Sequence, residues 1–179
     1  MFIEENIFND CLRYERRAQE ALYKSVFVDV MRISLRYVHN EDDAKGIVNS
    51  SMLKVFTKIR DYKGSSENFG GWIRRIVIND SLDYIRKQNT YTDKIELTEI
   101  EDTIGLSEEI SFDSEPNKIL LLLKELPLLS SSVFNLFVVE GYSHKEISEM
   151  LKISVANSKW NLHSARKQLK LLINKHQLI

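Results

Sequence analysis

Apolar side chains recur every three or four residues along much of the chain, which is the spacing of amphipathic helices. The first such stretch runs from about residue 14 to 38, and Ser25 marks a point where that helix can break. Asn40 is suited to cap a second helix, which continues to about Ile59, and a third helix spans about residues 67–87. Because no strand-like alternation persists, the pattern predicts an all-α protein.

The C-terminal part of the chain predicts two helices joined by a very short turn. One helix is expected over about residues 130–139, before the turn-forming residues that follow it. Ser143 and Glu146 then form the S-x-x-E pattern of a capping box at the start of the next helix. Ser154 is placed to cap a long final helix over about residues 155–173, so the pair is typical of a helix-turn-helix unit.

Charge divides the chain into three parts. Residues 1–88 carry 15 Lys/Arg and 13 Asp/Glu, residues 89–116 carry one Lys and nine Asp/Glu, and residues 117–179 carry nine Lys/Arg and four Asp/Glu. Helical periodicity also fades across the acidic part. We therefore expect two small helical domains, 1–88 and 116–179, joined by an acidic flexible linker over 89–115. The basic C-terminal domain indicates a polyanionic partner.

Several classes of protein are disfavoured by what the sequence lacks. It has no apolar run of the ~20 residues that a membrane helix needs, and its first ten residues are acidic rather than basic, so we expect a cytoplasmic protein without lipid insertion. Cys11 is the single cysteine, and the four histidines show no metal-ligand spacing. Since a glycine-rich phosphate loop is also missing, we expect no metal, no cofactor and no enzymatic activity.

One face of the final helix is cationic. At 100° per residue, the residues that gather on this face are Lys159, His163, Arg166, Lys167 and Lys170, with Trp160 beside them. Asn157 lies near the helix start, where it can meet a base edge. A basic solvated face is the more common meaning of such a stripe taken alone. The capped preceding helix, and the absence of any acid after Glu149, favour a surface that binds DNA phosphates.

The third helix offers a second candidate surface. Arg75, Asn79 and Arg86 fall on one side of it, and the loop over residues 63–68 that precedes it is polar. Such a face beside such a loop suits a phosphate backbone and an unstacked base. Trp72 can stack on nucleic acid, but a Trp on a mostly apolar helix is more often part of the core.

Two motifs give the chain a family resemblance. The first is W-x-x-x-I-x-x-N-x-x-x-D-x-x-R, from Trp72 to Arg86, and the second is E-G-x-S-x-x-E-I, from Glu140 to Ile147. Together with the helices around them, they resemble the second and fourth regions of extracytoplasmic-function sigma factors, a subfamily of the sigma-70 family of RNA polymerase sigma factors. The resemblance implies transcription initiation rather than enzymatic activity.

The resemblance also implies partners and a division of labour. The N-terminal domain would bind the β′ clamp of core RNA polymerase and open the −10 element of the promoter, and the C-terminal domain would read the −35 element and rest on the β flap. The acidic linker would occupy a polymerase channel. An anti-sigma factor, often membrane-bound, would mask these surfaces, and the free protein is expected to be a monomer.

The implied contacts fall on three sets of residues. Those for the −35 element are Ser154, Asn157, Lys159, Trp160, His163, Arg166, Lys167 and Lys170. Those for the −10 element are Lys63, Ser65, Asn68, Trp72, Arg75, Asn79 and Arg86. Those for the polymerase clamp are Asp43, Gly46, Asn49, Ser50 and Lys54.

The sequence departs from the family pattern at two places. An acidic D-x-x-Q-E pattern in the second helix is replaced by Gly46, Asn49 and Ser50, and arginines of the last helix are replaced by Asn161 and Ser164. These departures leave three alternatives open: a helix-turn-helix regulator that never joins the polymerase, a degenerate sigma paralogue, and a pure protein-interaction module. Salt-dependent DNA affinity separates the last from the others.

Overall fold

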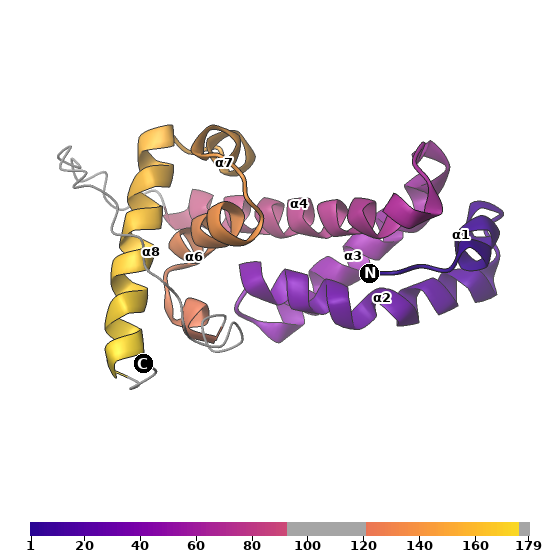
Figure 1. The fold of residues 1–179 in the computed structure, drawn as a ribbon, viewed down its shortest axis with the longest axis horizontal. Coiled ribbons are helices and arrows are strands. Elements are labelled where there is room, and N and C mark those ends of the chain that lie inside the picture. Colours follow the sequence, from indigo (N-terminus) through magenta and orange to yellow (C-terminus); the bar gives the residue numbers. More distant parts are fainter. Residues whose placement is uncertain (93–120, 176–179) are drawn as a thin grey trace. The chain divides into compact units, whose positions relative to one another are not determined.

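The computed structural model describes residues 1–92 and 121–175, with side chains over residues 1–88 and 121–175 (Figure 1). Every regular element in these residues is helical, which confirms the all-α prediction for them. The chain divides into two compact units, Met1–Tyr84 (unit 1) and Ile85–Ile179 (unit 2). Most of the predicted acidic linker lies outside the described residues, and the predicted domain boundaries stay a prediction.

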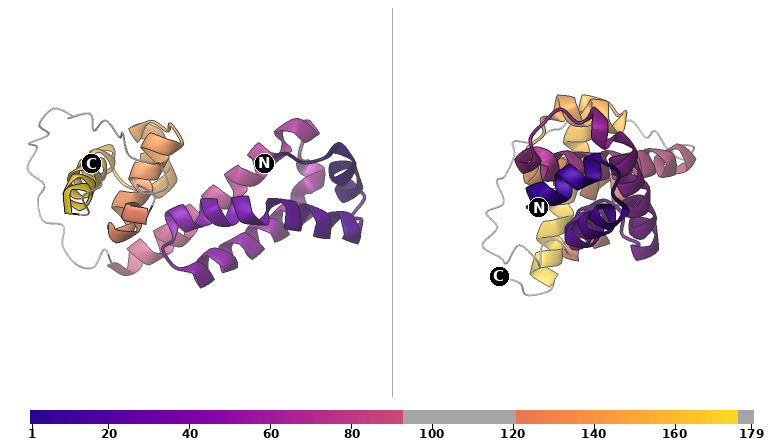
Figure 2. Two further views of the ribbon diagram at one scale, coloured as in Figure 1. Left: turned by 60° about the horizontal axis from the view of Figure 1, so that its bottom comes forward. Right: turned by 90° about the vertical axis from the view of Figure 1, so that its right-hand side faces the viewer.

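Unit 1 is a small helical bundle. Its elements are α1 (Glu5–Leu12), α2 (Arg16–Tyr37), α3 (Glu41–Lys58), the 3₁₀ turn η1 (Ile59–Asp61) and the larger part of α4 (Ser66–Thr92). The short connection at residues 38–40 makes α2 and α3 an antiparallel pair, which lies side by side in Figures 1 and 2. Their apolar stripes form the core with that of α4. Its fully buried members include Leu22, Val30, Val48, Val55, Ile73 and Val77.

The helix starts and ends of unit 1 follow from local chemistry. Asn40 caps α3 as predicted, since its side chain accepts hydrogen bonds from the backbone N–H groups of Asp42 (2.8 Å) and Asp43 (3.1 Å). The possible break at Ser25 does not occur, and α2 runs through this residue. The hydroxyl of Ser25 donates to the carbonyl of Leu22 (2.8 Å) in the preceding turn of the same helix.

Two features of unit 1 differ from the expectation. The helix α1 was not predicted. It has eight residues and only two buried side chains, Phe8 and Cys11, so the segment is too short for a helical repeat of apolar residues to be recognised. The helix α4 continues through Thr92, five residues beyond the predicted end. The added segment, residues 88–92, contains neither Gly nor Pro, so no helix breaker stops it.

Unit 2 holds the predicted helix-turn-helix. Its described elements are η2 (Leu123–Glu125), α6 (Leu128–Phe134), the π-helical turn η3 (Asn135–Val139), α7 (His144–Leu151) and α8 (Val155–Lys175). The capping box at α7 is present in full, because Ser143 and Glu146 bond each other's backbone N–H groups. Lys152 ends α7 in the left-handed region (φ 56°), which lets α8 start only three residues later.

Neither unit offers a membrane segment. Within residues 1–92 and 121–175, no helix is both long enough and apolar enough to cross a bilayer.

Candidate nucleic-acid interface

The outer face of α8 carries most of the residues predicted to contact a −35 element. The exposed positions along this helix are Val155, Ala156, Lys159, Trp160, His163, Lys167, Lys170, Leu171, Asn174 and Lys175. Trp160 is 45% exposed and Val155 is 40% exposed, so the cationic face also has apolar surface. The opposite side is buried against α6 and α7, notably at Leu162, Ala165 and Leu169. Ser154 accepts from the backbone N–H of Asn157 (3.0 Å) and therefore caps the helix.

Two of the predicted −35 contacts have structural partners as well. Arg166 is half-buried, with its guanidinium 6.0 Å from the centre of the Phe137 ring. Asn157 is half-buried, and its side-chain oxygen accepts a hydrogen bond from the Asn161 amide (2.5 Å). The amide nitrogen of Asn157 is the part of that side chain that can meet a base edge.

Asn161 is a structural residue that the sequence did not reveal. It replaces an arginine of the family pattern, and only 2% of it is exposed. Its side-chain oxygen accepts from the hydroxyl of Ser130 in α6 (2.8 Å), and its amide donates to the carbonyl of Asn157 (3.0 Å). A buried polar side chain whose hydrogen bonds are satisfied restricts how two helices can pack. Asn161 therefore fixes the position of α8 against α6.

A histidine at the start of α7 contacts both η3 and α8. His144 stacks on Phe137, with 4.6 Å between ring centres, and its Nδ1 lies 2.9 Å from the hydroxyl of Ser158. Burial, followed by the positive charges of Lys159 and Arg166, lowers the pKa of His144 below its ordinary 6.5. His144 is therefore neutral in the folded protein near neutral pH.

Acidification will weaken these contacts of His144. Because the pKa of His144 is lower in the folded chain, the unfolded chain binds the proton more tightly, and folding stability falls as the pH drops below about 6.5. Hydrogen exchange of the α7 and α8 amides at pH 7.5 and pH 5.5 measures the effect. In His144→Gln, which does not titrate, the loss of protection between the two pH values should shrink; an equal loss would place the titrating group elsewhere.

In unit 1, the loop before α4 wraps around one tyrosine. The hydroxyl of Tyr62 donates to the carbonyl of Ser65 (2.9 Å), and the amide of Asn68 donates to the hydroxyl of Ser65 (3.2 Å). A Cβ added at Gly64 would lie 2.3 Å from the Tyr62 hydroxyl oxygen, so only glycine lets the loop close this tightly. The predicted contacts Lys63 and Ser65 are exposed on the loop, and Asn68 is exposed in the first turn of α4, which begins at Ser66.

Tyr62 also belongs to an aromatic cluster that supports the loop. Its ring centre lies 5.2 Å from those of Phe69 and Trp72, and Phe8 of α1 packs edge-on against Phe69 at 4.9 Å. Trp72 is half-buried and stacks on Phe69, so one side is packed while another remains accessible. Tyr62 was absent from the predicted contacts, although an aromatic residue directly before a K-G-S-S loop was a usable signal.

Gly64→Ala should disorder this loop and spare the bundle. The added methyl group forces the Tyr62 ring out of its place, so the loop loses its anchor while the core of α2, α3 and α4 is untouched. We expect at least a tenfold loss of opening at the −10 element, measured by fluorescence of 2-aminopurine in the DNA, with unchanged far-UV circular dichroism. Gly71→Ala is the matched control, since its Cβ would meet no atom within 4 Å and it belongs to none of the predicted contacts.

The remaining −10 candidates lie at different places along α4. Arg75 and Asn79 are exposed and lie one helical turn apart within unit 1. Arg86 lies in unit 2, where its guanidinium donates to the backbone carbonyl of Met150.

The predicted clamp contacts of α3 divide into two kinds. Asp43 accepts from the hydroxyl of Tyr84 (2.8 Å) and Lys54 bonds Asp80 (2.5 Å), so both residues tie α3 to α4. Gly46 and Ser50 are exposed, as is Asn49, which accepts from the hydroxyl of Tyr23 (2.8 Å). Leu53, 64% exposed, adds an apolar side chain that the sequence analysis did not single out.

Catalytic and metal-binding groups do not assemble in the part of the chain that the structure describes. Within it, no three His, Cys, Asp or Glu side chains are placed to hold a metal ion. Cys11 is buried, and burial together with the charge of Asp10 raises its pKa to about 11, so its thiol stays protonated and is a poor nucleophile.

Comparison with known families matches both units. Residues 22–91 match Sigma-70 region 2, and residues 117–169 match Sigma-70, region 4. These matches include the aromatic cluster's Trp72, the Arg75–Asn79 face and most of the outer face of α8.

The chain is also similar to named sigma factors. It is 28% identical over 152 residues to the ECF RNA polymerase sigma factor SigE of Mycolicibacterium smegmatis, covering 82% of this chain and 58% of that protein. It is 26% identical to RNA polymerase sigma factor SigV of Bacillus subtilis, covering 84% and 87% of the two chains. It is 25% identical to ECF RNA polymerase sigma factor SigM of the same organism, covering 87% and 95%. The match thus spans less than two thirds of SigE.

A solved structure shares the fold. CnrH, determined in complex with the cytosolic domain of CnrY, superposes with a TM-score of 0.50 at 17% identity, covering 96% of this chain and 97% of that one. At this identity the similarity concerns the fold alone.

Proposed function

Because the chain belongs to the sigma-70 family, in its extracytoplasmic-function group, we propose that it directs promoter-specific transcription initiation by core RNA polymerase. In this role it acts as a cytoplasmic specificity subunit and not as an enzyme. One observation carries the proposal: a capped helix-turn-helix with an exposed cationic face shares the chain with a region 2 unit whose polar loop stands beside an accessible tryptophan.

Each DNA surface has a distinct task in this proposal. The outer face of α8 enters the major groove at the −35 element, where Lys159 and Lys167 neutralise phosphates and Trp160 meets base edges. The loop around Tyr62 holds a base that leaves the stack at the −10 element, with Trp72, Arg75 and Asn79 beside it. The support is exposure and charge: these side chains, apart from the half-buried Trp72 and Tyr62, face solvent.

The polymerase and regulatory contacts follow from family membership. We assign clamp binding to the exposed face of α3 around Gly46, Asn49 and Ser50, where Leu53 supplies apolar contact in place of the acidic side chains that the family pattern has. The β flap would meet unit 2, and an anti-sigma factor would compete for the same surfaces. The free protein is proposed to be a monomer.

Transcription with purified core RNA polymerase tests the proposal. A pool of genomic fragments is transcribed with and without this protein, and new transcripts are mapped. Transcripts that start at fixed sites downstream of a shared −35/−10 pair would support it. Their absence, with a folded protein that binds DNA, would instead indicate a regulator that does not join the polymerase.

Two substitutions at Gly46 distinguish an effect on the stability of α3 from an effect on polymerase binding. Gly46→Ala should stabilise α3 by about 1 kcal/mol, because a helix-interior glycine costs that much and the added methyl group meets no atom within 4 Å. Gly46→Asp keeps only a smaller part of that gain, because aspartate is a weaker helix former than alanine, and it adds the carboxylate of the family pattern. If the clamp binds this face, Gly46→Asp will tighten the Kd for core polymerase relative to Gly46→Ala, measured by fluorescence anisotropy. Identical Kd values would move the docking face elsewhere.

A further inference from the structure

Residues 1–14 contact both sides of the loop around Tyr62, the polar connection between η1 and α4 over residues 62–65. They comprise α1 and the short segments that flank it, and they precede residues 22–91, which match Sigma-70 region 2. No predicted DNA or polymerase contact lies among them. Figures 1 and 2 show α1 at the end of unit 1 where α3 leads into α4.

Before the loop, the contact is made by an arginine of η1. The Nε of Arg60 donates to the carbonyl of Leu12, the last residue of α1 (3.3 Å). The guanidinium of Arg60 also lies over the ring of Tyr14, with its Cζ 4.3 Å from the ring centre. Tyr14 has a φ of 61°, in the left-handed region that residues other than glycine rarely adopt, and such strain is often found at functional sites. The strained turn at Tyr14 is thus joined to η1, directly before Tyr62.

After the loop, the contact is made by a phenylalanine of α1. The ring of Phe8 meets that of Phe69 with 4.9 Å between the ring centres, and it meets that of Tyr62 edge-on at 6.0 Å. Only 8% of Phe8 is exposed, and Phe69 is completely buried. Tyr62 and Phe69 are the two rings that contact Trp72. Removal of the Phe8 ring would therefore leave a void beside both rings that support this tryptophan.

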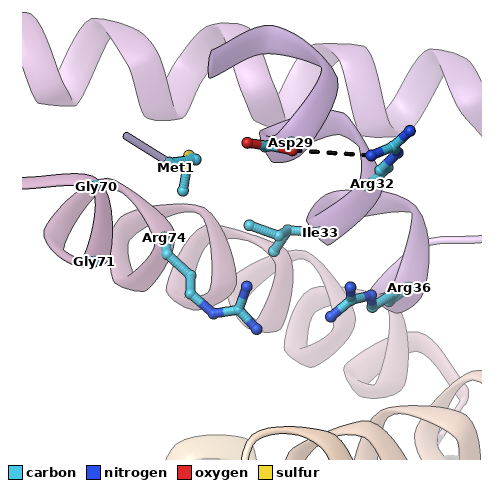
Figure 3. Close-up of a pocket in the computed structure, with 8 residues that line it drawn as sticks. All are labelled: Met1, Asp29, Arg32, Ile33, Arg36, Gly70, Gly71 and Arg74. Carbon is cyan, nitrogen blue, oxygen red and sulfur yellow. Dashed lines mark ion pairs between the residues drawn. The ribbon is translucent and has the colours of Figure 1, made fainter. Parts of the chain in front are cut away.

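Met1 packs against α4 directly after this aromatic cluster. A Cβ on Gly70, which follows Phe69, would lie 2.5 Å from the carbonyl oxygen of Met1 and 3.1 Å from its Cβ. Figure 3 shows Met1 beside the ribbon of α4 at Gly70 and Gly71. A glycine inside a helix lowers the stability of that helix relative to alanine. Gly70 therefore gives Met1 its place against α4 at the expense of the helix itself.

We propose that residues 1–14 position the loop around Tyr62 for the −10 element, and that Phe8 is the residue through which they act. This inference rests on the proposed −10 role of the loop and adds to it a segment outside the region 2 match. The hydrogen bonds described within the loop are local ones between Tyr62, Ser65 and Asn68, so its orientation on α4 depends on how the Tyr62 ring is packed. A loop that is ordered before the base arrives loses less conformational freedom on binding. Phe8 itself touches no DNA and is a positioning residue.

Two pairs of variants test the proposal in the full-length protein. Phe8→Ala removes the ring from the cluster, and its control, Val38→Ala, removes apolar atoms from a buried site (1% exposed) just beyond the end of α2 that is far from α1. Gly70→Ala pushes against the carbonyl oxygen of Met1, and its control, Gly71→Ala, makes the same change in α4 where the Cβ meets no atom within 4 Å. Since alanine favours the helix at both positions, the second pair separates the displacement of Met1 from a loss of α4.

The first measurement is acrylamide quenching of Trp72 fluorescence in the free protein, with Trp160→Phe present throughout because the chain has two tryptophans. Phe8→Ala and Gly70→Ala should expose Trp72 to the quencher more than their controls do. The second measurement, with Trp160 restored, is opening of the −10 element by holoenzyme, followed by 2-aminopurine fluorescence. We expect opening to fall about tenfold or more in Phe8→Ala, about threefold or more in Gly70→Ala and less than about twofold in the controls, with the Kd for core RNA polymerase within about twofold in all four.

Three results would overturn the proposal. Unchanged quenching in both Phe8→Ala and Gly70→Ala would show that residues 1–14 do not hold the cluster. Increased quenching with normal opening would show that the loop works without being held. Equal loss of opening in Phe8→Ala and Val38→Ala would reduce Phe8 to a contribution to stability. Failure of the unaltered protein to open any promoter would instead contradict the proposed function, and the quenching comparison would then decide alone whether residues 1–14 hold the loop.

Discussion

Replacing Lys159 and Lys167 together with alanine will weaken binding of this protein to promoter DNA by about 60-fold at 0.1 M salt. Both side chains are exposed on the outer face of α8. Each phosphate contact releases close to one counterion, so losing two contacts lowers the slope of log K against log[salt] by about 1.8 and removes about eightfold affinity per contact at this salt concentration. Filter binding or anisotropy over a salt series, on a fragment with the mapped −35 element, measures both numbers.

A charge-matched variant makes this experiment specific. Lys124→Ala with Lys175→Ala removes the same charge from unit 2, at η2 and at the end of α8, where Lys175 lies about 120° around the helix from His163. This control should change affinity by less than about threefold, since only long-range attraction is lost. If the two double variants lose equal affinity with equal slopes, α8 does not lie in the groove and unit 2 attracts DNA only through its net charge.

The sequence pattern was most informative where the spacing of nearby residues alone determines an element. The stripes of α2 and α3, the Asn40 cap and the capping box at Ser143 were all visible, because each depends on local spacing. The two motifs also identified both halves of the fold. Such features need no knowledge of what lies across the core.

The sequence did not reveal the roles of residues that depend on contacts with distant parts of the chain. Tyr62 looks like a loop residue until the loop closes over its ring, and its partners Phe8 and Phe69 come from other elements. Asp43 and Lys54 look like surface charges of one helix, yet each bonds a side chain of α4. A helical projection places residues around one axis but says nothing of a neighbouring helix.

Asn161 and Ser164 show the same limit at two positions where the family pattern has arginine. By the resemblance alone, both replacements imply fewer phosphate contacts. In the structure, Asn161 is buried between α8 and α6, whereas Ser164 is half-buried at the edge of the exposed face and accepts from Gln168 (3.0 Å). The two substitutions therefore have different physical meanings, and restoring arginine at each will have opposite results.

Asn161→Arg will destabilise unit 2 by about 4 kcal/mol or more. It places a charge where 2% of the native residue is exposed, and it breaks the hydrogen bonds to Ser130 and Asn157. Ser164→Arg will leave unit 2 folded and tighten DNA binding, because it adds one cation beside the outer face of α8. Hydrogen exchange of the α6 and α8 amides measures the first effect, and DNA affinity measures the second.

If Asn161→Arg aggregates, the milder change Asn161→Ala still tests whether Asn161 stabilises unit 2. It removes the three side-chain hydrogen bonds of Asn161 and leaves the Ser130 hydroxyl without its acceptor in the interface, at a cost of about 2 kcal/mol. A folded Asn161→Arg protein with tighter DNA binding would show that α8 can turn on α6 to present position 161. In that case the fold would not require asparagine at position 161. The outer face of α8 would also be wider than the structure shows.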